Sequence, residues 1–159
     1  MIPGLKSLLL ILPFLAGIMV SCDEKGVYDT YHHLPESVWQ SDSLLTYEFT
    51  IENTRQQHNL YLNIRNDRSY GFSNLWLFVS ITSPGGTALA DTMQVVLADP
   101  SGKWLGKGFT GIYHNKVTYR SNIFFPEEGK YSLILQHGMR PKELTGITDI
   151  GVRLEKSGR

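Results

Sequence analysis

The fold is decided by the stretch Leu45-Thr46-Tyr47-Glu48-Phe49-Thr50-Ile51-Glu52, in which apolar residues alternate with threonine and glutamate. Successive side chains of a β-strand point to opposite faces, so this period of two predicts a strand with one buried and one hydrated face. Such a strand is typical of an antiparallel sheet that packs one side against a core and shows the other side to water.

Further stretches with this alternation, or with a short apolar run, follow along the chain. Polar turns such as Ser83-Pro84-Gly85-Gly86 separate them. No amphipathic helix is indicated, and the best helical candidate, Pro141-Lys142-Glu143-Leu144, is expected to form a single turn. The pattern predicts the all-β class and a single antiparallel β-sandwich of the jelly-roll type. After residue 52, the expected strands cover residues 60–65, 75–81, 93–97, 117–120, 123–125, 131–136 and 150–154.

Composition indicates one globular domain. Of the 159 residues, 42% are hydrophobic, and 15 Lys+Arg balance 15 Asp+Glu. This hydrophobic content can support a core, which argues against a disordered chain. The balanced charge provides no basic face for phosphate groups, so we expect no nucleic-acid partner.

The N-terminus has the features of an export signal. Lys6 precedes a run from Leu8 to Val20 that is shorter than a membrane-spanning helix, and acidic residues follow it. The only cysteine, Cys22, follows Met19-Val20-Ser21, which resembles the bacterial lipobox. The alternative is an ordinary signal peptide that leaves Cys22 as a free, oxidation-prone thiol.

Lipidation of Cys22 would fix the protein to a membrane, because each buried methylene group contributes about 0.8 kcal/mol. We therefore expect a lipoprotein signal peptide over residues 1–21, a lipidated tether over 22–38 and a β-sandwich domain over 39–159. The polar tether contains the pair His32-His33. Neighbouring residues of an extended chain point to opposite sides, and no cysteine or suitably spaced histidine completes a ligand set, so we expect no metal and no cofactor.

Two further motifs resemble cofactor-binding or catalytic sites. The run from Gly106 to Gly111 matches G-x-G-x-x-G, but it lacks the strand, helix and parallel βαβ unit of a dinucleotide site, so we interpret it as a tight loop near Trp104. Glu127 and Glu128 are adjacent in a turn, whereas glycoside hydrolysis needs two carboxyl groups that face each other across a cleft, so we interpret them as solvated. No catalytic residue is predicted.

The apolar stretch around Trp76 gives a candidate binding surface. Leu75, Leu77, Val79 and Ile81 share one face of the expected strand, and Trp76 and Phe78 occupy the other. Either a loop or the N-terminal segment covers these two rings, which is the interpretation we prefer, or they form an exposed aromatic platform for a protein partner or a sugar ring. Trp104 is a third candidate for such a platform.

An ordered series of short motifs resembles the Bacteroidetes gliding-motility lipoprotein family GldH. The first half contributes Cys22, Val38-Trp39, Tyr61-Leu62-Asn63-Ile64-Arg65-Asn66, Tyr70 and Ser73-Asn74-Leu75. The second half contributes Asp91-Thr92, the stretch from Gly102 to Gly108, Gly129-Lys130-Tyr131, His137-Gly138-Met139-Arg140 and the stretch from Leu144 to Gly151. The resemblance extends over nearly all of the chain after Cys22.

This resemblance implies a lipid-anchored protein of the cell envelope, linked to gliding and to type IX protein secretion, and we expect the anchor to lie in the outer membrane. The implied partners are the membrane and other envelope proteins of that apparatus, and no enzymatic activity is implied. Only Cys22 transfers from the family as a site residue. A carbohydrate-binding lipoprotein that uses Trp76, Phe78 or Trp104 is the alternative function, and an enzyme is the third.

Overall fold

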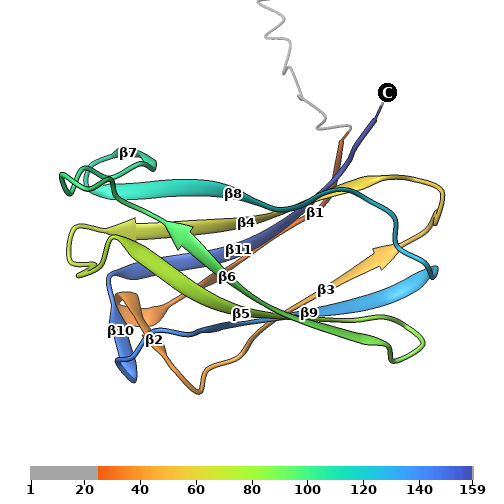
Figure 1. Ribbon diagram of the computed structural model, residues 1–159, viewed down its shortest axis with the longest axis horizontal. Coiled ribbons are helices and arrows are strands. Elements are labelled where there is room, and N and C mark those ends of the chain that lie inside the picture. Colours follow the sequence, from red (N-terminus) through yellow and green to blue (C-terminus); the bar gives the residue numbers. More distant parts are fainter. Residues whose placement is uncertain (1–24, 159) are drawn as a thin grey trace, which may run out of the picture.

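The computed structural model describes residues 25–158, which form a sandwich of β-strands (Figure 1). A single 3₁₀ turn, η1 at Pro35–Ser37, lies between the first two strands. The strands are β1 Gly26–His33, β2 Val38–Gln40, β3 Leu45–Ile51, β4 His58–Asp67, β5 Asn74–Thr82, β6 Ala88–Val96, β7 Lys107–Phe109, β8 Ile112–Ile123, β9 Gly129–His137, β10 Glu143–Thr145 and β11 Ile147–Lys156.

The strand order is that of a jelly roll. One sheet has the order β1-β11-β4-β8, extended by the short β7, and the facing sheet has the order β3-β9-β5-β6. The pairs in both sheets are antiparallel. When the eight long strands are counted along the chain, the sheets read 1-8-3-6 and 2-7-4-5, the arrangement of two Greek keys in a jelly roll. The predicted fold class is confirmed.

The core lies between the two sheets and follows the predicted alternation. On β3, Tyr47, Phe49 and Ile51 are at most 3% exposed, while the residues between them face water. The Tyr47 hydroxyl donates a hydrogen bond to the carbonyl oxygen of Ile150 in the opposite sheet, at 2.8 Å. This bond satisfies the one polar atom of a buried side chain, and burial raises the pKa of Tyr47.

The sandwich begins at Gly26 and not at residue 39. β1 pairs with β11 from Gly26 opposite Glu155 to His33 opposite Asp149. The expected tether over residues 22–38 is therefore wrong from residue 26 onward. β1 is an edge strand with half of its residues exposed, and such a strand needs little hydrophobic alternation, which explains why its polar composition concealed it.

The expected helical turn at residues 141–144 is also wrong. Glu143–Thr145 forms β10, which pairs with β2 and places Leu144 opposite Trp39. Both side chains are at most 1% exposed, and the Trp39 indole donates a hydrogen bond to the carbonyl oxygen of Ser43 at 3.0 Å. This small ladder closes one end of the sandwich over the core.

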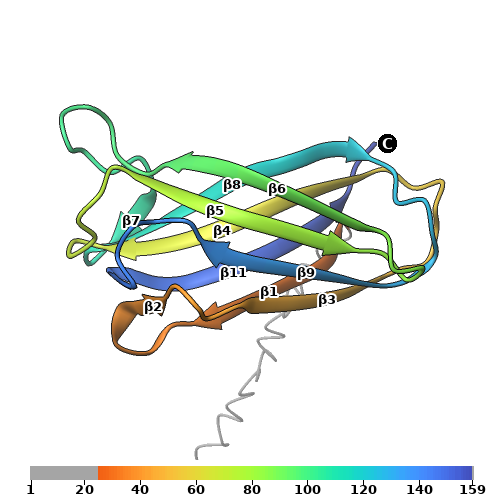
Figure 2. The same cartoon turned by 60° about the horizontal axis from the view of Figure 1, so that its bottom comes forward.

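The strand directions give the sandwich two distinct ends, which Figures 1 and 2 show at the right and the left. The Gly26 end, as we name it, contains the start of β1, the loops at residues 52–57, 83–87 and 124–128, and the end of β11. The Phe109 end contains residues 34–44, 68–73, 97–111 and 138–142. The two ends present different surfaces.

Candidate functional site

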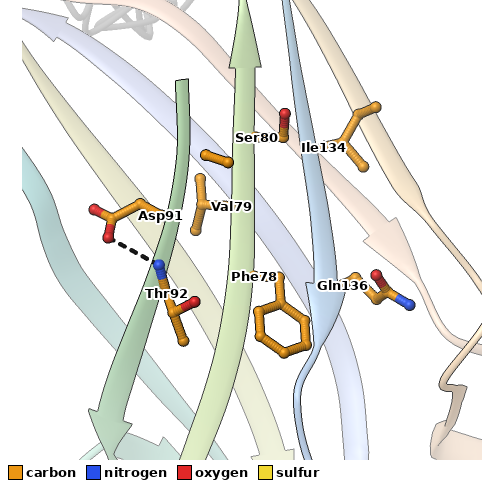
Figure 3. Close-up of a pocket in the computed structure, with 8 residues that line it drawn as sticks. Phe78, Val79, Ser80, Asp91, Thr92, Ile134 and Gln136 are labelled. Carbon is orange, nitrogen blue, oxygen red and sulfur yellow. Dashed lines mark hydrogen bonds between the residues drawn. The ribbon is translucent and has the colours of Figure 1, made fainter. Parts of the chain in front are cut away.

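Two aromatic side chains stand on the outer face of the β3-β9-β5-β6 sheet. Trp76 and Phe78 of β5 are 40% and 47% exposed, whereas Leu77 between them is buried in the core. Figure 3 shows the Phe78 ring between Thr92 of β6 and Gln136 of β9, which are its register partners. Within residues 25–158 the loop around Gly138 borders the two rings without covering them, so an exposed platform is observed and the preferred interpretation is wrong for the described loops. The N-terminal segment before residue 25 lies outside the described residues.

The loop after β9 extends this platform into a groove. The Gly138 backbone N–H donates to the carbonyl oxygen of Trp76 at 2.7 Å, and the Trp76 backbone N–H donates to the Met139 sulfur at 3.4 Å. These bonds hold residues 138–141 beside the start of β5. The resulting hollow, the aromatic groove, has a volume of about 720 Å³. Besides Trp76 and Phe78 it is lined by Phe72, Asn74, Thr92, Met139, Arg140 and Pro141.

Phe72 is a groove residue that the sequence interpretation missed. It lies before the first residue of β5 and is 39% exposed. The sequence contained a signal for Phe72. Residues 72, 74, 76 and 78 are spaced by two and therefore share one face of an extended chain. Following the alternation two residues backward from Asn74 would have added Phe72 to the predicted platform.

Trp104 lies apart from the groove. It belongs to the loop between β6 and β7, is half-buried, and packs against the Tyr113 ring with centroids 5.6 Å apart. Tyr70 connects it to the groove, with ring centroids 6.3 Å from Trp104 and 5.8 Å from Phe72. Trp104 therefore supports the Phe109 end by packing and does not line the groove.

The side chains that line the groove are apolar or uncharged, apart from Arg140. Asp91 on the neighbouring edge strand forms an ion pair with Arg120 at 2.7 Å and accepts a hydrogen bond from the Tyr119 hydroxyl at 3.3 Å. Burial raises the pKa of Tyr119, which keeps it a neutral donor. Arg140 is the charged side chain among the groove's lining residues, and it is exposed. The groove is therefore suited to bind apolar or aromatic groups and offers no acid–base pair for catalysis.

Glu127 has a structural role that the sequence interpretation missed. Its carboxylate accepts a hydrogen bond from the Ser83 hydroxyl at 2.8 Å and another from the Gly85 backbone N–H at 2.7 Å. It thereby joins the β8–β9 loop to the β5–β6 turn. The interpretation as a solvated carboxylate is wrong for Glu127, whereas Glu128 is exposed as expected.

The two neighbouring histidines point to opposite sides of β1. The His32 imidazole lies within hydrogen-bond distance of the Thr46 carbonyl oxygen, at 3.0 Å, and packs edge-on against Tyr47. His33 instead contacts the Asp149 carboxylate at 3.1 Å. In the described range, 25–158, no group of three or more His, Cys, Asp or Glu side chains is arranged to hold a metal ion.

The glycine motif from Gly106 to Gly111 forms a hairpin between β7 and β8. Lys107–Phe109 pairs with the start of β8, and the two turn residues Thr110 and Gly111 have φ angles of 65° and 93°. A strand and not a helix follows the turn, so the context of a dinucleotide site is missing here and the interpretation as a tight loop is confirmed.

Cys22 and the predicted signal peptide lie outside the described residues. Between residues 25 and 158, no helix has the length and apolar character needed to cross a membrane.

Comparison with known families identifies the chain. The family model described as GldH lipoprotein matches residues 26–154. The chain belongs to the GldH lipoprotein family. Its relatives include the gliding motility lipoprotein GldH homolog of Christiangramia forsetii, 40% identical over 86% of this chain and 88% of the relative. The gliding motility lipoprotein GldH of Flavobacterium johnsoniae is 35% identical over 92% of this chain and 94% of the relative.

Among solved structures, dimeric latent PorU from Porphyromonas gingivalis matches 84% of this chain and 13% of its own length. The sequence identity is 12% and the TM-score is 0.35, a likeness on which no argument rests.

Three of the short motifs that carry the resemblance to GldH lie at the aromatic groove. The Ser73-Asn74-Leu75 motif leads into β5, the Asp91-Thr92 motif of β6 contributes Thr92 to the lining, and the His137-Gly138-Met139-Arg140 motif ends β9 and forms the groove's second wall. His137 points inward and is 2% exposed, and burial lowers its pKa. The groove is thus built from segments by which this chain resembles the family.

Proposed function

We propose that this protein is a lipid-anchored, non-enzymatic component of the envelope machinery for gliding and the associated type IX secretion. Cys22 carries the lipid and holds the chain at the outer membrane. The β-sandwich binds another envelope protein of the apparatus through the aromatic groove. Family membership and the names of the two relatives support the gliding role, and the resemblance noted from the sequence supports the link to secretion.

The observation that carries the docking role is the exposure of three large aromatic rings on one surface. Phe72, Trp76 and Phe78 are between 39% and 47% exposed and line one hollow. Aromatic side chains in a pocket are the usual anchors of protein interfaces, because they bury much apolar area for little loss of side-chain entropy. Arg140 at the same groove provides a cation that can pair with an acidic group of the partner.

The experiment is photo-crosslinking in intact cells, with a photoreactive amino acid at position 78. The matched control carries the same probe at Phe109, which is 89% exposed on the tip of the β7–β8 hairpin. We expect position 78, and not position 109, to capture a gliding or secretion protein, and the double variant Trp76→Ala, Phe78→Ala to lose gliding and secretion. A deletion strain that keeps normal secretion and, in a motile host, normal gliding would refute the proposal.

Glycan binding is a second candidate function, favoured by the polar neighbours of Phe78. Thr92 and Gln136 flank the ring on either side, and Ser80 follows on the same face, so hydroxyl and amide groups surround an aromatic platform (Figure 3). Sugar rings stack on aromatic faces and exchange hydrogen bonds with such neutral groups. Retention in gels containing envelope glycans, lost in Phe78→Ala with an unchanged melting temperature, would favour this function. Absence of retention on every glycan would remove it.

A further inference from the structure

The corrected start of the sandwich fixes how far the domain can lie from its membrane. A tether over residues 22–38 would reach about 60 Å when extended, at roughly 3.5 Å per residue. Because β1 starts at Gly26, only four chain steps separate it from Cys22, which span at most about 14 Å. A lipid on Cys22 therefore keeps the start of β1 beside the bilayer surface.

The Gly26 end also carries an exposed apolar patch. Leu89 and Phe124 are 53% and 57% exposed. They come from β6 and from the loop after β8, and they border one hollow of about 340 Å³ between the ends of the two sheets. Ile81, Ile123 and Tyr131 line the same hollow. We name Leu89, Phe124 and the exposed Pro126 beside them the apolar rim.

We propose that the apolar rim contacts the lipid bilayer to which the chain is anchored, so that the sandwich rests on the membrane by its Gly26 end. The proposal rests on the lipid anchor at Cys22 described above. Two observations support the proposal: the short tether brings this end to the bilayer surface, and the apolar rim is exposed at this end. Apolar side chains that meet the boundary of headgroups and acyl chains are stabilised by transfer out of water.

Charge makes a smaller contribution at this end. Lys25, Arg55 and Lys156 are exposed here, and so are the acidic residues Glu52 and Glu128. The charges nearly cancel, so attraction to anionic headgroups is weak and the contact depends on the apolar rim. We therefore expect the contact to persist when the salt concentration is raised, because salt screens charge interactions and not apolar ones.

The test measures lipid proximity at single positions of the full acylated protein, reconstituted into vesicles of phosphatidylethanolamine and phosphatidylglycerol. A diacylglyceryl thioether on Cys22 blocks its sulfur, so Phe124→Cys supplies one free thiol for an environment-sensitive fluorophore. Phe109→Cys at the opposite end is the matched control, and Leu89→Cys serves as a second probe in case the Phe124 replacement disturbs its loop. Brominated lipids, which quench only a fluorophore in contact with acyl chains, report the proximity.

We expect quenching at positions 124 and 89 to exceed that at position 109 at least fivefold, at both low and high salt. Insertion of fifteen Gly/Ser residues after Glu24 should lower it at least twofold, because a longer tether lowers the effective concentration of the rim at the bilayer. Equal, weak quenching at all three positions on vesicles that carry the protein would overturn the proposal. Failure of the protein to float with the vesicles would instead refute the lipid anchor of the proposed function.

Discussion

Glu127 offers the sharpest test of how the turns of this sandwich are held together. Its carboxylate accepts hydrogen bonds from the Ser83 hydroxyl at 2.8 Å and from the Gly85 N–H at 2.7 Å. These residues lie 44 and 42 positions before Glu127 in the chain. Replacing Glu127 with alanine removes both bonds and leaves the two donors to water. A hydrogen bond to a charged group contributes roughly 1.5 to 3 kcal/mol to stability. The two bonds of Glu127 are partly exposed, so we expect each to lie at the lower limit of this range. We expect Glu127→Ala to lower the unfolding free energy by about 2 to 3 kcal/mol.

Glu127→Gln tests the contribution of the charge. With its Oε1 turned to the Gly85 N–H, glutamine donates its amide N–H to the Ser83 hydroxyl oxygen, so both contacts are kept but neither involves a charged group. We expect this variant to lose about 1 to 2 kcal/mol, between alanine and the original residue. Glu128→Ala is the matched control, because Glu128 is the neighbouring exposed carboxylate, and exposed substitutions usually change stability by less than about 0.5 kcal/mol.

Thermal unfolding followed by circular dichroism provides the assay. For a domain of this size about 1 kcal/mol corresponds to roughly 3 to 4 °C, so Glu127→Ala should melt about 6 to 12 °C below Glu128→Ala. Equal melting temperatures of the two alanine variants would show that the bridge contributes no stability. Glu127 would then be the solvated carboxylate that its sequence context suggested.

Two further predictions concern backbone strain and pH. Gly146 has a φ of 88°, and a Cβ added to it would lie 2.3 Å from the Tyr70 backbone nitrogen. Gly146→Ala should therefore lower the free energy of unfolding by more than about 3 kcal/mol. Gly86→Ala, where φ is 86° and no atom is near, should lower it by about 1 kcal/mol. Similar urea midpoints for the two variants would contradict this. Burial lowers the pKa of His58 and His137 below the ordinary value of 6.5. The unfolded chain therefore binds more protons than the folded chain at acidic pH. The free energy of unfolding should fall as the pH drops from about 6.5 towards the pKa values of the folded chain. Urea midpoints should decrease between pH 8 and pH 5.5, and His58→Gln should reduce that decrease; a midpoint that is constant with pH would refute the reasoning.

The long strands with regular alternating burial were predictable from the sequence, both in the middle of a sheet, like β5, and at an edge, like β3. β3 and β5 each bury alternate residues, so a period of two marked both strands and most of the core. The strands that sequence reasoning missed are β1, β2, β7 and β10, which are short or lie at an edge. These four strands bury few side chains and in no regular alternation, so their sequences show no period of two, whereas the edge strand β3 shows it because every second side chain is buried in the core.

The candidate site was predictable only in part, for a related reason. Alternation in β5 placed Trp76 and Phe78 together on the face opposite Leu77, and the structure confirms this. Whether a segment covers those rings depends on where distant parts of the chain pack, and β1 pairs with the other sheet. The role of Glu127 depends on the approach of two turns that only the tertiary structure brings together.

The two proposals together predict the height at which a partner must meet this protein. The apolar rim lies at the Gly26 end, whereas Phe72, Trp76 and Met139 line the groove where β5 begins, towards the Phe109 end. The ten residues of β4 run between the ends, and ten residues of strand span about 33 Å. A sandwich that stands on its Gly26 end therefore holds the groove roughly 20 to 30 Å from the lipid surface. A partner that binds the aromatic groove therefore has to project a folded domain beyond the lipid headgroups. A protein confined within the bilayer cannot reach the groove.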